Sequence, residues 1–436
     1  MTLPLEERER FEVTVGEPAH GGHCVARHEG MVLFVRHALP GERVVAEITE
    51  VHRGYARAEA VEILQASADR VPAPCPWSGP NACGGCDLQH VAPAAQLEWK
   101  ASVVRDLLAR LAHLPDQVVR VEQLPSVIGA DGAPDAGWRT RVRYTVDAVG
   151  RPGLRKHRSH EVVEIGSCMI AHPAIRALPV LGRTWETDSV ETVAPSSEPA
   201  VSAGPAPGAS LRSAGEPAFI ITDPAQPIVE RAAGHEFTLA AGGFWQVHPA
   251  AAQTLVDAVL SQLEPKPGET AWDLYGGSGL FAAAVADRVG VTGQVILVES
   301  AADGVAAARA NLAGMPVRVV QSTVERAVAP RRNARRRGPS QSMPLRAGAA
   351  SVQGPVDLVV LDPPRTGAGK HVVAAVAAAG PRAVSYVACD PAALARDVAT
   401  FRGLGWELAQ LRAFDCFPFT HHIECVALLL PAAPTR

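Results

Sequence analysis

The sequence predicts an α/β protein in three parts: a small β-barrel at residues 1–66, a β-rich central domain at 67–242 and a doubly wound domain at 243–436. Two observations predict this arrangement. In the last part, apolar segments of strand length alternate with amphipathic helical segments, which is typical of a mostly parallel sheet covered on both faces. Between residues 10 and 63, short alternating segments are separated by Gly-Gly and Pro-Gly turns, as in a small barrel.

The composition fits a globular chain and excludes fibrous and wholly disordered classes. The 436 residues are 47% hydrophobic and 20% charged, which is enough for a sizeable core in two or three domains. The formal net charge is only -4, so contact with nucleic acid has to come from local basic patches. Because the chain starts without the apolar core of a signal peptide and no run reaches the roughly 18 apolar residues of a membrane span, we expect a cytoplasmic protein without membrane contact.

The elements follow in order along the chain. After the barrel, residues 93–114 have the apolar periodicity of a helix, which we expect to pack on the last domain, and strand hairpins follow at 138–165. Residues 184–217 and 329–354 are poor in apolar residues and predict mobile insertions. In the last domain we expect helices at 249–263, 279–289 and 301–313 and strands at 270–274, 294–298, 357–361, 384–388, 406–412 and 423–430.

A glycine-containing loop, Asp273-Leu-Tyr-Gly-Gly-Ser-Gly279, follows the first strand of the last domain and opens its helix. Glycines allow a ligand to approach the backbone, and Glu299 at the end of the next strand can bind both hydroxyls of a ribose. Spacing alone leaves both a dinucleotide and S-adenosylmethionine possible. The loop lacks the Gly-x-Gly-x-x-Gly fingerprint of dinucleotide-binding proteins, which favours the methyl donor. Asp362-Pro-Pro-Arg365 ends another strand beside the same crevice, and its arginine stands where amine methyltransferases usually have an aromatic residue.

Four of the eight cysteines have the spacing of a metal centre. Cys75, Cys83 and Cys86 are clustered, and Cys168 follows a basic hairpin. Structural zinc generally uses two close pairs of ligands, whereas three clustered cysteines and a distant fourth suit a [4Fe-4S] cluster. We therefore favour the cluster, with zinc as the alternative.

The basic hairpin predicts a nucleic-acid surface. Arg139, Arg141 and Arg143 alternate, which would place three guanidinium groups on one face of a strand, and more basic residues follow at 155–160. Guanidinium groups bind phosphate oxygens through paired hydrogen bonds. The alternative is an ordinary solvated charged face.

A thiol follows one of the late strands, and a carboxylate is available from further along the chain. Cys389 comes directly after an apolar strand, and Glu424 lies 35 residues further along. A thiol at a strand's carboxyl end with a carboxylate nearby can act as a covalent nucleophile with its own base. A buried packing cysteine is the alternative.

Seven ordered motifs, spread over nearly the whole chain, resemble the bacterial RNA uracil-5 methyltransferases. The N-terminal barrel is similar to the TRAM module, an OB-like RNA-binding barrel found in some members. The matching strings are Cys83-Gly-Gly-Cys-Asp-Leu-Gln-His90, Gly153-Leu-Arg-Lys-His-Arg-Ser-His160, Phe244-Trp-Gln-Val-His248, Asp273-Leu-Tyr-Gly-Gly-Ser-Gly279, Asp362-Pro-Pro-Arg365, Cys389-Asp-Pro-Ala-Ala-Leu-Ala-Arg-Asp397 and Phe417-Pro-Phe-Thr-His-His-Ile-Glu424.

The resemblance implies a class I, Rossmann-like methyltransferase domain and a role for each matching residue. Cys389 would be the nucleophile and Glu424 the base, and the four cysteines would hold the [4Fe-4S] cluster. Asp390 departs from the asparagine usual after the nucleophile and could raise the pKa of the thiol. Gly276 also departs, standing where a cysteine is common. Contacts to S-adenosylmethionine are implied for Gln246, Tyr275, Leu280, Glu299, Thr323 and Asp362.

The activity implied is methylation of carbon 5 of a specific uridine through a covalent adduct between the cysteine and carbon 6. A TRAM module with a cysteine cluster is more like the enzymes that act on 23S rRNA than the minimal tRNA enzyme. We expect a monomer that binds structured RNA. Two alternatives stay open: an RNA cytosine-5 methyltransferase, which uses the same cysteine addition, and a non-catalytic iron–sulfur RNA-binding protein.

Overall fold

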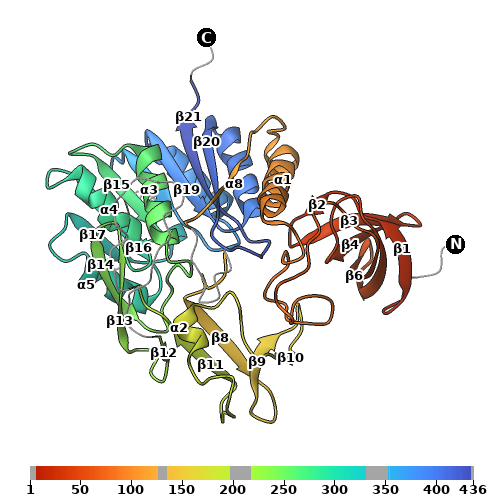
Figure 1. Cartoon of the computed structure of the whole chain (residues 1–436). Helices are drawn as coiled ribbons and strands as arrows, with labels where there is room; N and C mark the ends of the chain where they lie inside the picture. Colours follow the sequence, from red (N-terminus) through yellow and green to blue (C-terminus); the bar gives the residue numbers. More distant parts are fainter. Residues whose placement is uncertain (1–5, 126–134, 197–217, 330–351, 353, 434–436) are drawn as a thin grey trace, which may run out of the picture.

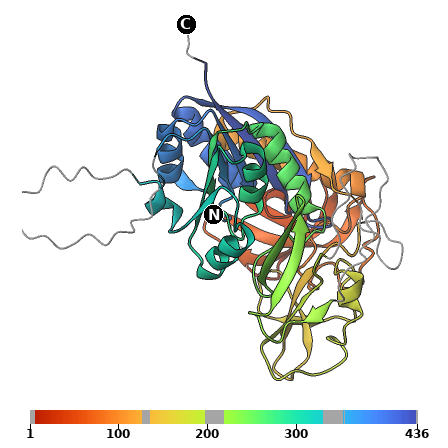
Figure 2. The ribbon, with the colours of Figure 1, turned by 90° about the vertical axis from the view of Figure 1, so that its left-hand side faces the viewer.

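The computed structural model describes residues 6–125, 135–196, 218–329, 352 and 354–433. Figure 1 shows the barrel (red) at one side, the α/β domain (green to blue) at the other, and helix α1 (Pro93–Ala112, orange) between them. A central sheet (yellow) extends below the α/β domain in this view and in the turned view of Figure 2. The predicted α/β fold class is confirmed.

An eight-stranded sheet forms the centre of the α/β domain, in the order β17-β16-β15-β18-β19-β21-β20-β7. Neighbouring strands from β17 to β19 are parallel, β21 is antiparallel to both β19 and β20, and β7 is parallel to β20. The strands are β7 (Val121–Gln123), β15 (Thr270–Leu274), β16 (Gln294–Glu299), β17 (Val317–Gln321), β18 (Leu358–Leu361), β19 (Ala383–Ala388), β20 (Trp406–Asp415) and β21 (Glu424–Pro431).

Helices cover both faces of this sheet, because successive side chains of each strand point to opposite sides. Trp272 and Ile296 pack on one face with α1, α7 and α8, whereas Ala271 and Val295 pack on the other with α3 and α4. Lys100 of α1 is buried and its ammonium group lies 2.5 Å from a carboxylate oxygen of Asp415 in β20. The remaining helices are α3 (Ala251–Leu263), α4 (Leu280–Val289), α5 (Ala302–Asn311), α6 (Val324–Ala327), α7 (Gly369–Ala379) and α8 (Pro391–Gly403).

The N-terminal barrel is a six-stranded sheet in the order β1-β5-β6-β4-β3-β2. Alternating residues of its strands, such as Val44, Ala46 and Ile48, are buried inside it. The barrel core joins the core beneath α1 in one continuous apolar cluster, so the barrel is packed against the rest of the chain. Its strands are β1 (Arg10–Thr14), β2 (Pro18–Ala19), β3 (His23–His28), β4 (Met31–Arg36), β5 (Arg43–Val51) and β6 (Tyr55–Gln65).

The central part has a five-stranded sheet in the order β10-β9-β8-β11-β12 and a small core around Trp138 and Tyr144. A separate hairpin, β13 with β14, packs on α3 and α4 through Phe237 and Leu239. The elements are β8 (Arg141–Val146), β9 (Pro152–Arg155), β10 (Val162–Glu164), α2 (Pro173–Arg176), β11 (Ser189–Val193), β12 (Phe219–Ile220), β13 (Pro227–Ala232) and β14 (His235–Ala240).

The structure corrects two expectations about the elements. The expectation of a mobile insertion over 184–217 is wrong for residues 189–193. These residues form β11, which pairs with β8 and buries Val190 and Val193. The five residues of this strand, Ser-Val-Glu-Thr-Val, were hidden by the polar composition of the longer stretch. Residues 197–217 and 330–351 of the two expected insertions lie outside the described residues. Strand β17 was not expected. No helix among the described residues has the length and apolar character needed to cross a membrane.

Candidate active site and cysteine group

The predicted site residues lie at the ends of neighbouring strands. Strands β15 to β19 are parallel, so their carboxyl ends share one edge of the sheet. Strand β21 runs the opposite way and pairs Cys425 with Ala388, which brings its first residue, Glu424, to the same edge. This edge therefore gathers Tyr275 after β15, Glu299 at the end of β16, Thr323 after β17, Asp362 after β18 and Cys389 after β19.

The loop after β15 is tightly built and requires small residues. The backbone N–H groups of Tyr275 and Gly276 both donate to the carbonyl of Val298, at 3.0 and 3.1 Å. A Cβ on Gly276 would lie 2.5 Å from Cγ of Leu297 and 2.9 Å from a carboxylate oxygen of Asp273. The departure at Gly276 is thus explained by packing, since Leu297 takes the space that a side chain would need.

Glu299 is held in place by backbone donors. One carboxylate oxygen accepts from the N–H groups of Ser300 and Ala301, at 2.6 and 2.7 Å, and the other accepts from Gly277 in the loop, at 3.1 Å. A carboxylate has about four lone-pair positions, so acceptor capacity remains for ligand hydroxyls. Three further residues were expected to contact the methyl donor. Of these, Gln246 is half-buried, Leu280 is buried and Thr323 is exposed.

Three carboxyl groups near this edge have raised pKa values. Burial, reinforced by Asp362 and Glu299, raises the pKa of Asp273 to about 7, although the Ala282 backbone amide lowers it somewhat. Burial also raises the pKa of Asp362 to about 7 and that of Glu424 well above its usual value. No side chain in the described part of the chain donates a hydrogen bond to either carboxylate oxygen of Asp273. A cationic ligand such as a sulfonium would offset the cost of charging these groups, so the residues fit S-adenosylmethionine.

The thiol of Cys389 is half-buried and protonated at rest. Burial raises its pKa to about 11, with a further contribution from Glu424, while the positive charge of Arg365 lowers it. Glu424 is buried, and burial together with Asp362 keeps its proton affinity high. The pair therefore combines a thiol that must lose its proton with a carboxyl group that binds protons strongly.

Asp390 holds two partners through its two carboxylate oxygens. One oxygen caps α8 by accepting from the N–H of Ala393 at 2.7 Å, and the other lies 3.2 Å from Nε2 of His20 in the barrel. Burial alone would raise the pKa of Asp390, but these two interactions outweigh it and the pKa is lowered. The raised pKa of the Cys389 thiol comes mainly from burial and from Glu424.

A small pocket surrounds the nucleophile. Sequence reasoning assigned no role to its histidines: His421 and His422 stand in a matching motif, whereas His20 lies in the barrel and gave no signal. The pocket is lined by His20, Arg365, Cys389, Asp390, Pro391, His421, His422 and Ile423.

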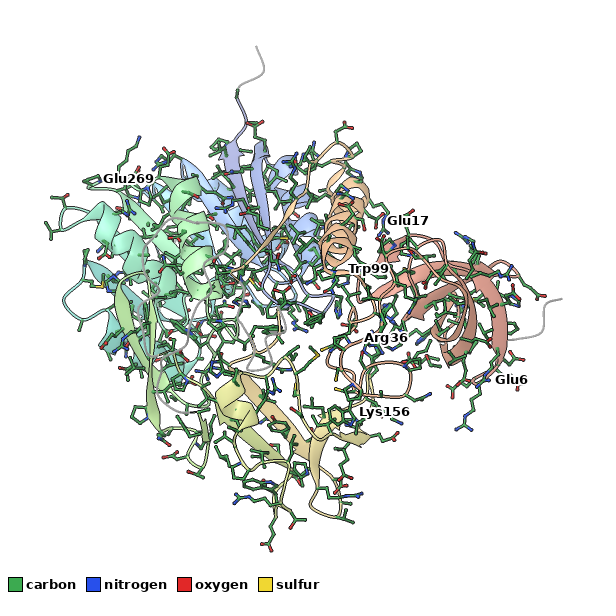
Figure 3. The ribbon with its side chains drawn as sticks, viewed as in Figure 1. Glu6, Glu17, Arg36, Trp99, Lys156 and Glu269 are labelled. Atoms are coloured by element: carbon green, nitrogen blue, oxygen red, sulfur yellow. The ribbon has the colours of Figure 1, made fainter. Side chains whose placement is uncertain are left out.

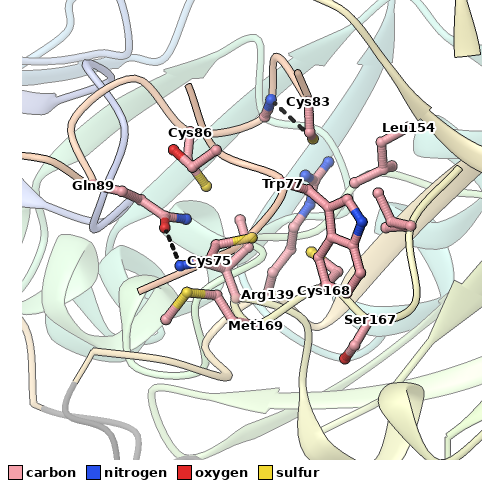
Figure 4. Close-up of a pocket in the computed structure, with 14 residues that line it drawn as sticks. Cys75, Trp77, Cys83, Cys86, Gln89, Arg139, Leu154, Ser167, Cys168 and Met169 are labelled. Carbon is pink, nitrogen blue, oxygen red and sulfur yellow. Dashed lines mark hydrogen bonds between the residues drawn. The ribbon is translucent and has the colours of Figure 1, made fainter. Parts of the chain in front are cut away.

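The four predicted cysteines line a second cavity, together with Trp77 and Arg139 (Figure 4). Burial raises the pKa of each thiol, to about 11 for Cys83, and the charges of Cys75 and Cys168 raise the pKa of Cys83 further. Within the described ranges, no three His, Cys, Asp or Glu side chains are placed to hold a single metal ion.

The predicted row of three guanidinium groups is wrong. Arg139 precedes β8, and its Nε donates to the carbonyl of Arg141. Arg141 donates to the carbonyls of Ala241 and Gly243 and pairs with the buried Glu230. These contacts come from a segment about 90 to 100 residues away, which strand alternation could not reveal. Of the three, only Arg143 is exposed, and Arg155 and Arg158 are exposed on the hairpin.

A parallel sheet with a glycine loop after its first strand and a carboxylate ending the second defines an S-adenosylmethionine-dependent methyltransferase domain, here carrying an N-terminal barrel. Family models agree: that of the TRAM domain matches residues 4–61 and that of tRNA (Uracil-5-)-methyltransferase matches residues 227–431. The chain belongs to the RNA (uracil-5-)methyltransferase family, and it is an enzyme of that family.

Relatives match along their whole lengths. The chain is 48% identical to an uncharacterized RNA methyltransferase of Streptomyces avermitilis, over 98% of this chain and 99% of that one. It is 32% identical to the 23S rRNA (uracil(1939)-C(5))-methyltransferase RlmD of Alkalilimnicola ehrlichii, over 97% and 96%. Among solved structures, the tRNA (uracil-54, C5)-methyltransferase of Pyrococcus abyssi, in complex with S-adenosyl-L-homocysteine, has the same fold with a TM-score of 0.64, 20% identity and coverage of 96% and 99%.

Proposed function

We propose that the protein methylates carbon 5 of a specific uridine in structured RNA, in 23S rRNA rather than tRNA, through a covalent adduct with Cys389. The observation that carries this proposal is the meeting of Cys389 and Glu424 beside Asp362 at one sheet edge. The choice of 23S rRNA follows the Alkalilimnicola relative, which is named for that activity and matches along its whole length.

The chemistry requires a nucleophile because carbon 5 of uracil is itself a poor one. Cys389 loses its proton to solvent and the thiolate adds to carbon 6, which makes carbon 5 enolate-like. Carbon 5 then forms its bond to the methyl group, and the bond between that group and the donor sulfur breaks. Glu424 as carboxylate takes the proton from carbon 5, and the bond between carbon 6 and sulfur breaks to return the thiolate. Each turnover releases one proton.

The donor supplies an electrophilic methyl group on a positively charged sulfur. In this proposal Glu299 binds the ribose hydroxyls, and Asp362 and Asp273 lie where their negative charge offsets that of the sulfonium. Tyr275, Leu280, Gln246 and Thr323 complete the contacts. The raised pKa of both aspartates, caused by burial, supports a site that gains from a cationic ligand.

The four cysteines would hold a [4Fe-4S] cluster that fixes the fold between the barrel and the basic hairpin. Their shared cavity, and the arrangement of three clustered cysteines with a distant fourth, support this assignment over zinc. Iron and sulfide analysis of anaerobically purified protein tests it, with Cys75→Ser as the variant and Cys24→Ser, a buried barrel cysteine, as the control. If the protein contains one zinc ion per chain and no iron, the four cysteines form a zinc site and the cluster assignment is wrong.

Methylation of transcripts by purified protein tests the activity. Incubation with 23S rRNA and tRNA transcripts should give 5-methyluridine in the rRNA, detected by nucleoside mass spectrometry. Product found only in tRNA would show that tRNA is the substrate. Formation of 5-methylcytidine would show that the enzyme methylates cytidine and not uridine. No product with any RNA would favour a non-catalytic RNA-binding protein.

Two variants test the roles of the catalytic pair. Cys389→Ala should abolish methyl transfer and leave donor binding unchanged, whereas Cys24→Ala should keep the activity. Glu424→Gln should accumulate a covalent RNA adduct, seen as a band that survives denaturation, because carbon 5 keeps its proton. Normal turnover of Cys389→Ala would overturn the covalent mechanism.

A further inference from the structure

The barrel reaches the pocket of the nucleophile through the turn between β2 and β3. His20 in this turn lines that pocket together with Cys389 and Arg365. Its Nε2 lies 3.2 Å from a carboxylate oxygen of Asp390, the residue next to the nucleophile. Its ring also faces the edge of the His421 ring, with centroids 6.4 Å apart. A residue of the RNA-binding module is thus part of the wall around the reacting thiol.

The turn is held on its other side by the cysteine segment. Gly21 and Gly22 have φ values of 97° and 78°, which L side chains rarely adopt. A Cβ on Gly22 would lie 2.9 Å from Cβ of Asp87, the residue after Cys86. The backbone of the turn therefore passes too close to Asp87 for a side chain, and this close passage directs His20 toward Asp390.

Asp87 also anchors the barrel by a buried pair of interactions. One carboxylate oxygen lies 2.7 Å from the guanidinium group of Arg36 in β4, and the other lies 2.5 Å from Nδ1 of His421 in the pocket. Arg36 and Asp87 are both buried, and Figure 3 shows Arg36 on the side of the barrel that faces the rest of the molecule. The barrel is fixed next to the pocket, so the contact of His20 is set by the fold and not by one flexible side chain.

Asp390 transmits this contact to the nucleophile. One carboxylate oxygen of Asp390 contacts His20, and the other caps α8 by accepting from the N–H of Ala393, so both oxygens are held in place. Because Cys389 and Asp390 share a peptide bond, the position of Asp390 limits where the thiol can lie. Small displacements of reacting groups change rates strongly.

We propose that His20 is a positioning residue of the target-uridine pocket, through which the barrel holds Asp390 and so places the Cys389 thiol for attack on carbon 6. The proposal rests on the covalent uridine methylation proposed above. It gives the barrel a part in the chemistry in addition to RNA binding.

The test measures the rate of covalent adduct formation with RNA that carries 5-fluorouridine, in the presence of S-adenosylmethionine. Fluorine cannot leave carbon 5 as a cation, so the adduct persists after methyl transfer. His20→Ala should form it about fivefold more slowly at saturating RNA, since it loses one partly exposed, charge-assisted hydrogen bond. His20→Gln, which keeps a donor for Asp390, should recover part of the rate. The matched control is His52→Ala, because His52 is similarly exposed and bonds Glu50 within the barrel itself.

Two further variants separate positioning from RNA binding. Gly22→Ala should slow the adduct in the same way, because its Cβ would push the turn away from Asp87. In an Asp390→Asn background, which keeps the cap of α8, the effect of His20→Ala should shrink, since the charged partner is already absent. A role confined to RNA binding would raise the RNA concentration needed for half-maximal rate and leave the rate at saturation unchanged.

The outcomes distinguish the two proposals. If His20→Ala forms the adduct as fast as the wild-type protein at saturating RNA, the role of His20 is overturned and the uridine mechanism stands. Absence of any adduct with the wild-type protein would overturn the mechanism itself.

Discussion

Replacing Glu424 by glutamine should make the Cys389 thiol more reactive while it stops turnover. In the wild-type protein the thiol has a pKa of about 11, raised from 9.0 by burial and by Glu424. At pH 8 its thiolate fraction is then about 100-fold lower than at the ordinary pKa, and the greater intrinsic nucleophilicity of a more basic thiolate recovers about tenfold. We therefore expect the wild-type thiol to be alkylated about tenfold more slowly than an ordinary exposed thiol.

Burial is the main cause of the raised pKa of the thiol, and the charge of Glu424, where that group is ionised, adds to it. Alkylation of Glu424→Gln by iodoacetamide at pH 8 should therefore be faster than that of the wild type. Trypsin releases residues 383–396 as a peptide with Cys389 as its only cysteine, so mass spectrometry can follow this thiol alone. Glu407→Gln, an exposed glutamate on β20, is the control. The wild-type rate should rise tenfold per pH unit up to about pH 10. A plateau below pH 9 would refute the raised pKa of the thiol, and equal rates in the two proteins would refute the contribution of Glu424 to it.

Three other perturbations test the structure. Donor affinity, measured by calorimetry, should rise between pH 6 and 8 as Asp273 and Asp362, both with a pKa of about 7, become anions. Asp273→Asn should reduce that rise, and an unchanged profile in the variant would contradict the assignment. Glu42→Gln should cost about 3 kcal/mol of unfolding free energy, because Glu42 is buried and pairs with Arg70. The folded pKa of Glu42 is lowered, so its contribution is present above the unfolded pKa and lost as pH falls; denaturation curves of wild type and variant should converge toward acid pH. Gly276→Cys should cost about 1–3 kcal/mol in the same assay, and an unchanged midpoint would show that the loop relaxes.

Local sequence was informative wherever a function depends on neighbours along the chain. Alternating helices and strands predicted the sheet, and the residues that follow parallel strands were expected at one edge before any coordinates, because parallel strands end together. Cys389 belongs to this group, whereas Glu424 reaches the same edge as the first residue of the antiparallel strand β21. The strand at 189–193 was missed because its five residues stand inside a long polar stretch whose average composition hides them.

Contacts between distant segments could not be predicted in this way. Arg141 was expected to face RNA, yet it binds carbonyls of the segment after β14. The cap that Asp390 makes on α8 and its contact with His20 were not foreseen either. Each outcome depends on which surface the fold places opposite a side chain, and spacing along the chain carries no record of that surface.

The sequence by itself determined the class of chemistry, because its motifs place a thiol and a glycine loop after strands of one parallel sheet and a carboxylate 35 residues beyond the thiol. Only the tertiary structure decided that the barrel shares the pocket of the nucleophile. The reason is physical: the turn at His20 and the end of β19 are brought together by packing of the barrel beneath α1 and by the buried Arg36, Asp87 and His421 contacts, and no local pattern specifies that docking.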